Sequence, residues 1–207
     1  GTAILDGFVI TGGNASNAVD SRGLGGGMYN NHNSPTIAHC IFMHNTAYSY
    51  GGGMYNSSSC VSSSAVTDCI FSNNSAGSGG GMYNSGLFSS SSNSTVINCL
   101  FSNNSAKTYG GGMYSDSTVS STLINCTFTG NSAASAGGGI SASSSVLRAQ
   151  NCIFWGNSAP TGPQLYTSYS NNSVYVISYC DIQGGWEGEG NIAADPLFVD
   201  AANGHMK

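Results

Sequence analysis

The sequence predicts an all-β solenoid, a parallel β-helix of about six to seven turns with roughly 28 residues in each turn. The first observation is a GGGMYN motif that recurs in five similar copies, whose starts are 26, 28, 31 and 27 residues apart. The second is a CxFxxNxA motif that keeps step with it. A two-part unit of this period is typical of a solenoid, in which each turn buries its apolar face only against its neighbours. The copies of the first motif begin at Gly25, Gly51, Gly79, Gly110 and Gly137.

Within one unit the apolar residues stand in short runs between Ser, Asn and Gly, and helical spacing does not persist beyond a single helical turn. Three strands of about three to five residues, separated by corners, fit such a unit. Strands of successive turns then pair in parallel about 4.8 Å apart, so that equivalent residues stack on one another. Each motif position therefore becomes a column that runs along the solenoid.

Three columns of apolar side chains are expected to form the core. Burying one such side chain stabilises the fold by about 1.5–3 kcal/mol, so three per turn offset much of the cost of ordering the strands. The aromatic column is Phe42, Phe71, Phe101, Phe128 and Phe154. The other two are Met28, Met54, Met82, Met113 and Ile140, and Ile37, Val66, Val96, Leu123 and Val146.

An asparagine follows each of these phenylalanines by three residues, where the chain has to turn. Asn suits a corner because it tolerates positive φ and its amide bonds to backbone or to the next Asn of a stack. The triple glycines predict another corner, where positive φ or close backbone approach excludes a Cβ atom. The asparagine column is Asn45, Asn74, Asn104, Asn131 and Asn157.

Six of the seven cysteines form a further column. Ligands of a zinc or iron–sulfur site converge on a point, whereas a column spreads them along an axis, so we expect buried thiols and no metal site. Disulfides between stacked neighbours would need local distortion, because parallel Cβ vectors hold the Cβ atoms too far apart. Whether the thiols are paired stays open. The column is Cys40, Cys69, Cys99, Cys126, Cys152 and Cys180, and Cys60 lies outside it.

The repeat runs without a linker, which predicts one elongated domain over residues 1–207. We expect a partial first turn over residues 1–24, repeat turns over residues 25–186, and a tail or cap over residues 187–207. Charged residues make up 6% of the chain and the net charge is −5, so there is no basic surface for nucleic acid. No apolar run approaches the roughly 20 residues of a transmembrane segment.

The pairing of GGG[MI] with FxxN, present here as FMHN, FSNN, FSNN, FTGN and FWGN, resembles the GGA[ILV] and FxxN repeats of chlamydial polymorphic outer membrane proteins. It is also similar to the wider pectin-lyase-like family of right-handed parallel β-helices, found in many large secreted bacterial proteins. The resemblance covers about residues 7–185. It implies a right-handed helix, a secreted or cell-surface location in a bacterium, and a chain that belongs to something longer.

Relatives that cleave polysaccharides need clustered carboxylates and, in the lyases, calcium and a basic side chain. Here Asp68 and Asp116 are isolated, while Lys107 and Arg148 fall in different columns. We therefore predict no catalytic residue and no cofactor. Calcium at an acidic cluster near the C-terminus is an alternative, although a solvated loop is the expected role of that cluster. The cluster is Asp181, Glu187, Glu189, Asp195 and Asp200.

A tyrosine follows the Met position in most turns, and strand alternation would turn it outward if Met faces the core. Tyr50 and Tyr109, each just before a triple glycine, would widen the resulting stripe. Such a stripe could stack on sugar rings or on another protein. Alternatively, the tyrosines stabilise the sheet by stacking on one another. The stripe is Tyr29, Tyr55, Tyr83, Tyr114 and Tyr166.

These observations favour a non-catalytic extracellular β-helix that acts as a structural and adhesive scaffold. Exposed strand edges at its ends would let copies stack end to end into filaments. The expected partners are therefore the chain itself, surface glycans or surface proteins. A carbohydrate-binding or polysaccharide-degrading module is the alternative function.

Overall fold

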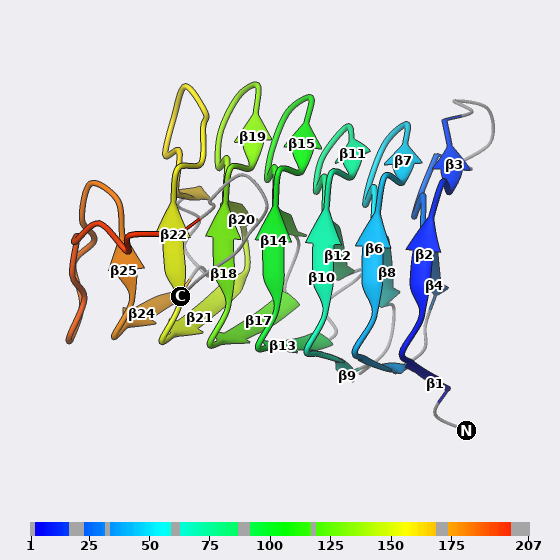
Figure 1. The fold of residues 1–207 in the computed structure, drawn as a ribbon, viewed down its shortest axis with the longest axis horizontal. Coiled ribbons are helices and arrows are strands. Elements are labelled where there is room, and N and C mark those ends of the chain that lie inside the picture. Colours follow the sequence, from blue (N-terminus) through cyan, green and yellow to red (C-terminus); the bar gives the residue numbers. More distant parts are fainter. Residues whose placement is uncertain are drawn as a thin grey trace.

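A computed structural model describes residues 3–16, 23–31, 34–58, 63–86, 92–116, 119–168 and 174–199. The chain winds as a parallel β-helix of about five complete turns with a partial turn at each end (Figure 1). Every regular element of the described residues is a strand. The predicted all-β solenoid is confirmed. Within the described ranges there is no helix with the length and apolarity needed to cross a membrane.

Sheet 1 has seven strands and carries the column that begins with Ile37. Its strands are longest in the middle of the solenoid, where they reach six residues. Burial alternates along them, as in β17, because successive side chains point to opposite faces of a strand. The strands are β1 (Ile4–Asp6), β5 (Thr36–Ala38), β9 (Ser63–Thr67), β13 (Ser92–Ile97), β17 (Val119–Ile124), β21 (Val146–Gln150) and β24 (Val174–Ser178).

The fifth member predicted for this column, Val146, is wrong. Leu123 pairs with Ala149, whereas Val146 pairs with Ser120 and is half-buried. The register is set by the distance to the following cysteine, since every true member of the column stands three residues before one. Val146 stands six residues before Cys152 and therefore falls outside the column.

Sheet 2 also has seven strands and carries the phenylalanine column. The rings are fully buried and stack nearly parallel, with centroids 4.5–5.1 Å apart. This spacing follows from the in-register pairing of the strands, as in Phe71 with Phe101. The strands are β2 (Val9–Thr11), β6 (Ile41–Met43), β10 (Ile70–Ser72), β14 (Leu100–Ser102), β18 (Thr127–Thr129), β22 (Ile153–Trp155) and β25 (Asp181–Ile182).

Sheets 3 and 4 complete each turn, so that most turns have four strands and not the three expected. Sheet 3 consists of two-residue strands just after the asparagine column: β3 (Asn14–Ala15), β7 (Thr46–Ala47), β11 (Ser75–Ala76), β15 (Ser105–Ala106) and β19 (Ser132–Ala133). Sheet 4 carries the Met column: β4 (Met28–Asn31), β8 (Met54–Ser58), β12 (Met82–Gly86), β16 (Met113–Asp116), β20 (Ile140–Ser143) and β23 (Leu165–Ser168).

The triple glycine forms the corner between sheets 3 and 4. Gly51 has a φ of 67°, which favours glycine. A Cβ atom on Gly52 would lie 2.4 Å from the carbonyl oxygen of Gly80 in the next turn, and one on Gly53 would lie 2.6 Å from that of Gly81. Positive φ and close backbone approach therefore both operate, at different glycines of the same corner.

The asparagine corner differs from the prediction in one respect. The residue with positive φ is the one before the column, such as Asn73 with a φ of 54°, and not Asn74 itself. Asn74 is fully buried and its amide nitrogen donates to the carbonyl of Phe42 at 2.8 Å and to Oδ1 of Asn104 at 3.0 Å. Burial of this amide without partners would be costly, so the column is held by its own ladder of hydrogen bonds.

The C-terminal end of the solenoid is covered by the segment that follows β25. The backbone N–H of Ile182 donates to the carbonyl of Ile192 at 2.9 Å, and that of Ile192 donates to the carbonyl of Cys180 at 2.9 Å. Trp186 packs against the apolar core. Residues 183–192, called the cap below, therefore cover β25 and the adjoining core, whereas the outer edge of β24 pairs with no described strand.

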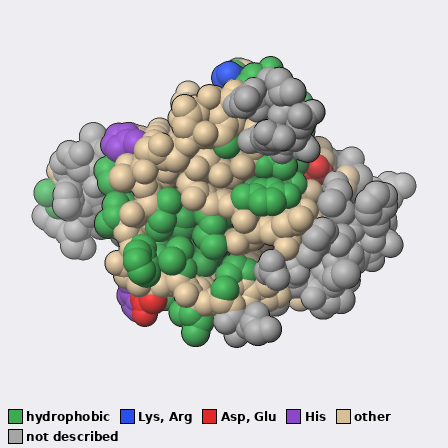
Figure 2. Space-filling model, turned by 90° about the vertical axis from the view of Figure 1, so that its right-hand side faces the viewer, with side chains coloured by type: hydrophobic (Ala, Val, Ile, Leu, Met, Phe, Trp, Pro, Cys, Tyr) green, Lys and Arg blue, Asp and Glu red, His purple; other side chains and the backbone are tan. Residues whose placement is uncertain are grey.

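The N-terminal end presents its first turn to solvent over the described residues. Ile4, Phe8 and Val9 are exposed by 72%, 57% and 59%. Figure 2 looks onto this end and shows hydrophobic side chains gathered on it with few charged ones. The outer edges of β1 and β2 pair with no other described strand, since both stand first in their sheets.

Candidate functional site

The tyrosine column follows sheet 4, one residue after the Met column. Ring centroids are 5.4 Å apart for Tyr29 and Tyr55 and 5.3 Å apart for Tyr55 and Tyr83. Tyr55 and Tyr83 do not form part of an exposed stripe, because their exposed fractions are only 7% and 4%. Neighbouring rings cover them, and the centroid of Tyr50 lies 4.5 Å from that of Tyr83. The other members are Tyr29, which is exposed, and Tyr114 and Tyr166, which are half-buried.

A second row of side chains lies just before each triple glycine. Backbone pairing places Tyr50, Ser78 and Tyr109 in successive turns of this row. Tyr50 and Tyr109 are 40% and 41% exposed, so they do widen the aromatic surface. Because Ser78 is small, a ring is missing from the row between the two tyrosines.

A hollow of about 350 Å³ lies at this gap, called the tyrosine hollow below. Backbone and side-chain atoms of residues 48–50, 77–78 and 108–109 surround it together with groups from β12 and β16. Tyr83 and Tyr114 meet edge to face there, with centroids 5.1 Å apart and ring planes inclined by 63°. Its aromatic lining is Tyr48, Tyr50, Tyr83, Tyr109 and Tyr114, and its charged group is the carboxylate of Asp116.

The electrostatics of the hollow are set by Asp116. The hydroxyl of Tyr83 donates to Oδ2 of Asp116 at 3.2 Å. Burial, together with this carboxylate, raises the pKa of Tyr83 far above its usual value and that of Tyr114 to about 12. Both phenols are therefore neutral at physiological pH, and Asp116 supplies the negative charge of the site.

Two hydroxyl groups on the polar side of the hollow are already engaged. Thr108 donates its hydroxyl hydrogen to the carbonyl of Gly77 at 2.7 Å. The Oγ of Ser78 lies 2.6 Å from Oγ1 of Thr108, and since Thr108 has used its hydrogen, Ser78 is the donor. What these two residues leave for a ligand is therefore lone pairs.

A smaller hollow of about 150 Å³ lies on the other side of Tyr109. It shares Tyr109 and Tyr114 with the tyrosine hollow and adds Tyr166 and serine hydroxyls of β20 and β23. Tyr109 therefore forms a wall between two depressions along the same face. Of the tentative binding residues, Tyr83 and Tyr114 line the larger hollow, Tyr114 and Tyr166 the smaller one, and Tyr29 and Tyr55 neither.

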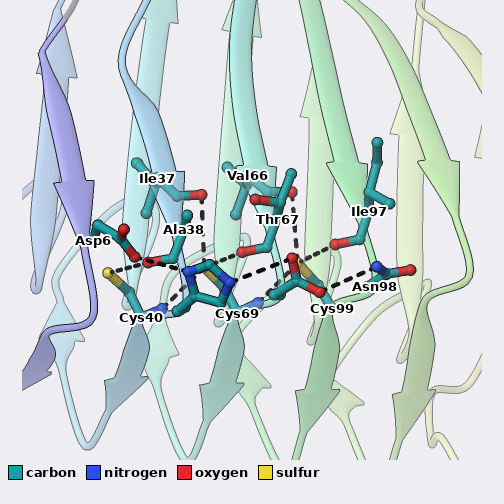
Figure 3. A network of polar contacts seen from close by, with 12 residues as sticks. Asp6, Ile37, Ala38, Cys40, Val66, Thr67, Cys69, Ile97, Asn98 and Cys99 are labelled. Carbon is teal, nitrogen blue, oxygen red and sulfur yellow. Dashed lines mark hydrogen bonds and ion pairs between the residues drawn. The ribbon is translucent and has the colours of Figure 1, made fainter.

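The cysteine column is buried and its thiols are free (Figure 3). The backbone N–H of Cys69 approaches Sγ of Cys99 at 3.4 Å, and Sγ of Cys69 donates to the carbonyl of Thr67 at 3.1 Å. The pKa of the Cys99 thiol lies far above its usual value, because its hydrogen bonds with Cys126 and Cys69 and its burial disfavour the thiolate. The thiols of the column are therefore buried and without a disulfide, and Cys60 lies outside the described residues.

An exposed ladder runs beside the cysteines at the corner between sheets 1 and 2 (Figure 3). His39 Nδ1 lies 2.8 Å from Oδ1 of Asp6, and its Nε2 lies 3.9 Å from Oδ2 of Asp68. Asn98 donates to Asp68 at 3.1 Å, which continues the ladder into the next turn. The hydrogen bond to Asp6 raises the pKa of His39 above 6.5. The sequence did not single out Asp6, whose turn matches the repeat only partially.

The C-terminal acidic residues are spread over β25, the cap and the segment after it. Asp181 accepts from the backbone N–H of Ala194 at 3.1 Å, and Glu189 accepts from the hydroxyl of Tyr179. Burial, and to a lesser degree the charge of Asp195, raise the pKa of Asp181. No group of three or more His, Cys, Asp or Glu side chains with the arrangement of a metal site occurs among the described residues, and Asp200 lies outside them.

The sequence analysis missed Ser78, Thr108 and the role of Asp116. A signal existed for Ser78, because the positions before the glycine triplets read Tyr50, Ser78 and Tyr109 once the motifs are aligned. For Asp116 there was none, since its contact with Tyr83 joins turns that only the folded register brings together.

A family model described as "Right handed beta helix region" matches residues 6–178. The match begins in β1 and ends with β24, so it includes every residue of the tyrosine hollow. Comparison with curated proteins and with solved structures finds no match.

Proposed function

Because the chain belongs to the right-handed β-helix family, we propose that it is a non-catalytic extracellular scaffold, a rigid rod with an adhesive face at a cell surface or in a matrix. The observation that carries the proposal is that the repeated side chains pack against one another inside the protein. Phenylalanine, asparagine and cysteine columns run from turn to turn and are buried. Side chains that repeat in this way stiffen the body of the solenoid. The surface of the chain is rich in neutral polar groups.

We also propose that the chain is related to bacterial surface proteins with repeats like those of the chlamydial polymorphic outer membrane proteins. The support is the alternation of GGG[MI] and FxxN in step over five turns. Antibody labelling of intact cells of the organism that makes the protein tests this placement. Labelling without permeabilisation is expected, and labelling that requires permeabilisation contradicts it.

The test of the scaffold role sets it against the polysaccharide-degrading alternative. Purified chain is incubated with neutral and acidic polysaccharides, and new reducing ends and unsaturated products are measured. We expect no product. Product formation that is lost in the Asp116→Asn variant would overturn the non-catalytic proposal, because this carboxylate lies in the tyrosine hollow.

End-to-end assembly, if it is part of the function, has to use the N-terminal end. The cap lies on the opposite end, and its strand-like pairing with β25 occupies one of the edges that a second copy would need. Head-to-tail filaments therefore require displacement of the cap. Electron microscopy of the intact chain is expected to show particles or pairs, and long filaments would contradict this arrangement.

A further inference from the structure

We propose that the tyrosine hollow binds an organic cation, specifically a trimethylammonium head group such as that of choline. This binding activity goes beyond the scaffold role. Five tyrosines line one depression, and the charged group in its lining is the carboxylate of Asp116. Aromatic side chains with an adjacent carboxylate are the groups that recognise quaternary ammonium ions.

A tyrosine of this lining already contacts a cation. The ammonium of Lys107 lies 5.7 Å from the centroid of Tyr48, within the range of a cation–π contact. Lys107 and Tyr48 are both exposed, so this contact stands at the rim of the hollow and leaves the partly exposed ring of Tyr114 for a ligand. Tyr83 is almost fully covered and supports the ring of Tyr114 edge to face.

Several hydrogen-bond donors of the hollow already have acceptors within the protein. The hydroxyl hydrogens of Thr108, Ser78 and Tyr83 are committed to Gly77, Thr108 and Asp116. The backbone N–H groups of Ser78 and Thr108 are also engaged, with the carbonyls of Ser49 and Gly77. These groups therefore offer lone pairs, whose electron density attracts a cation. An anion would meet the charge of Asp116.

The volume of the hollow and the net charge of the chain also fit a small cation. A volume of about 350 Å³ lies at the lower end of ligand sites, which run from roughly 300 to 1,000 Å³, and fits a head group better than a long chain. The net charge of −5 also favours the approach of a cation over that of an anion.

The test is a calorimetric titration of the intact chain with choline chloride at constant ionic strength. The matched probe is 3,3-dimethylbutan-1-ol, which has the same shape without the charge. We expect choline to bind at least about tenfold more tightly than the neutral isostere. Equal affinities, or no heat of binding with choline up to tens of millimolar, would overturn the proposal.

Three variants locate the site. Asp116→Asn retains an acceptor for Tyr83 and is expected to weaken choline binding about tenfold without loss of fold. Ser78→Tyr fills the gap in the row and should abolish binding. Tyr29→Ala lies outside the hollow and should leave the affinity unchanged. If Ser78→Tyr binds as the wild type does, the hollow is not the site and the proposal fails. Circular dichroism of each variant establishes that it is folded.

Two further arms separate the sources of the head group and the competing ligand class. Vesicles of phosphatidylcholine, compared with vesicles of phosphatidylglycerol, show whether a lipid head group is accepted as free choline is. Selective retention on the former extends the proposal to lipid surfaces, and choline binding without it limits the ligand to a free cation. A glycan array that yields a ligand lost in Ser78→Tyr, with choline inactive, would overturn the proposal in favour of a sugar site.

Discussion

The two ends of the solenoid continue the same two long sheets but are finished differently. In the interior, the N–H of each column cysteine points at the sulfur of the next, and that sulfur also faces a backbone carbonyl of the turn before, as Cys99 faces Val66. At the C-terminal end, Asn191 takes both roles: its Oδ1 accepts from Cys180 N–H at 2.9 Å and its Nδ2 donates to Ile177 O at 3.0 Å. At the N-terminal end, no described residue does this for the first turn.

The asparagine column ends at the same side by a similar substitution. The amide of Asn157 donates to Oε1 of Gln164 at 2.7 Å, and the amide of Gln164 donates to Oε1 of Gln183 at 3.0 Å. Glutamine side chains thus replace the asparagine that a further turn would supply. This solenoid therefore stops where side chains outside the repeated columns satisfy the polar groups of the last turn.

The largest loss of stability is expected from a substitution in the interior of the solenoid. The variants of the two ends are compared with it. Asn131→Ala removes an amide that accepts from Asn104 and donates to the carbonyl of Phe101 at 2.9 Å. Because buried groups on both sides lose partners, we expect the free energy of unfolding to fall by about 3–5 kcal/mol. Chemical denaturation measures it, with the exposed neighbour variant Ser132→Ala as a control. A loss below about 1 kcal/mol would contradict the role of the ladder.

The second largest effect is a difference in stability between a variant of the C-terminal end and a variant of the N-terminal end. Asn191→Ala leaves Cys180 N–H and Ile177 O without their partner and should cost about 1–3 kcal/mol. Asn14→Ala, at the open end, removes a side-chain bond that, among the described residues, is the local one to Ser16 N–H, and should change stability by less than about 0.5 kcal/mol. Equal losses for the two variants would mean that Asn191 does not close the last turn.

How far the sequence predicted this molecule depends on whether a feature repeats. The phenylalanine and asparagine columns follow from motif spacing alone, because a repeated residue in a solenoid has only one place to stack. The misplaced Val146 arose where a column has no motif of its own and the turn is bounded by a serine-rich stretch. The cap arises from single residues such as Asn191, which no period can reveal. The tyrosine hollow arises from Ser78, which stands out from the row only once the motifs are aligned.

The third effect concerns association through the open end. Phe8→Ser combined with Val9→Thr alters side chains that are more than half exposed, so stability should change by less than about 0.5 kcal/mol. Any concentration-dependent increase in the sedimentation coefficient of the wild type should disappear in this variant. Association that persists unchanged would place the contact elsewhere on the molecule.

The smallest effect is the pH dependence of the stability of the first turns. The hydrogen bond with Asp6 raises the pKa of His39 above its unfolded value of 6.5. Its stabilising contribution is therefore complete below about pH 6.5 and is lost as the pH rises through the folded pKa. NMR titration should show a raised pKa for His39 that falls in Asp6→Asn. An unchanged value in that variant would mean that Asp6 is not the cause.

Hydrogen exchange of individual amides in the intact chain tests most directly whether one end is closed and the other open. The amides of Cys180 and Ile182, which donate to the cap, should be protected almost as well as interior amides such as Ile70. Those of β1 and β2 that face away from the next turn should exchange much faster. Equal protection at both ends, or faster exchange in β25 than in β2, would contradict the account.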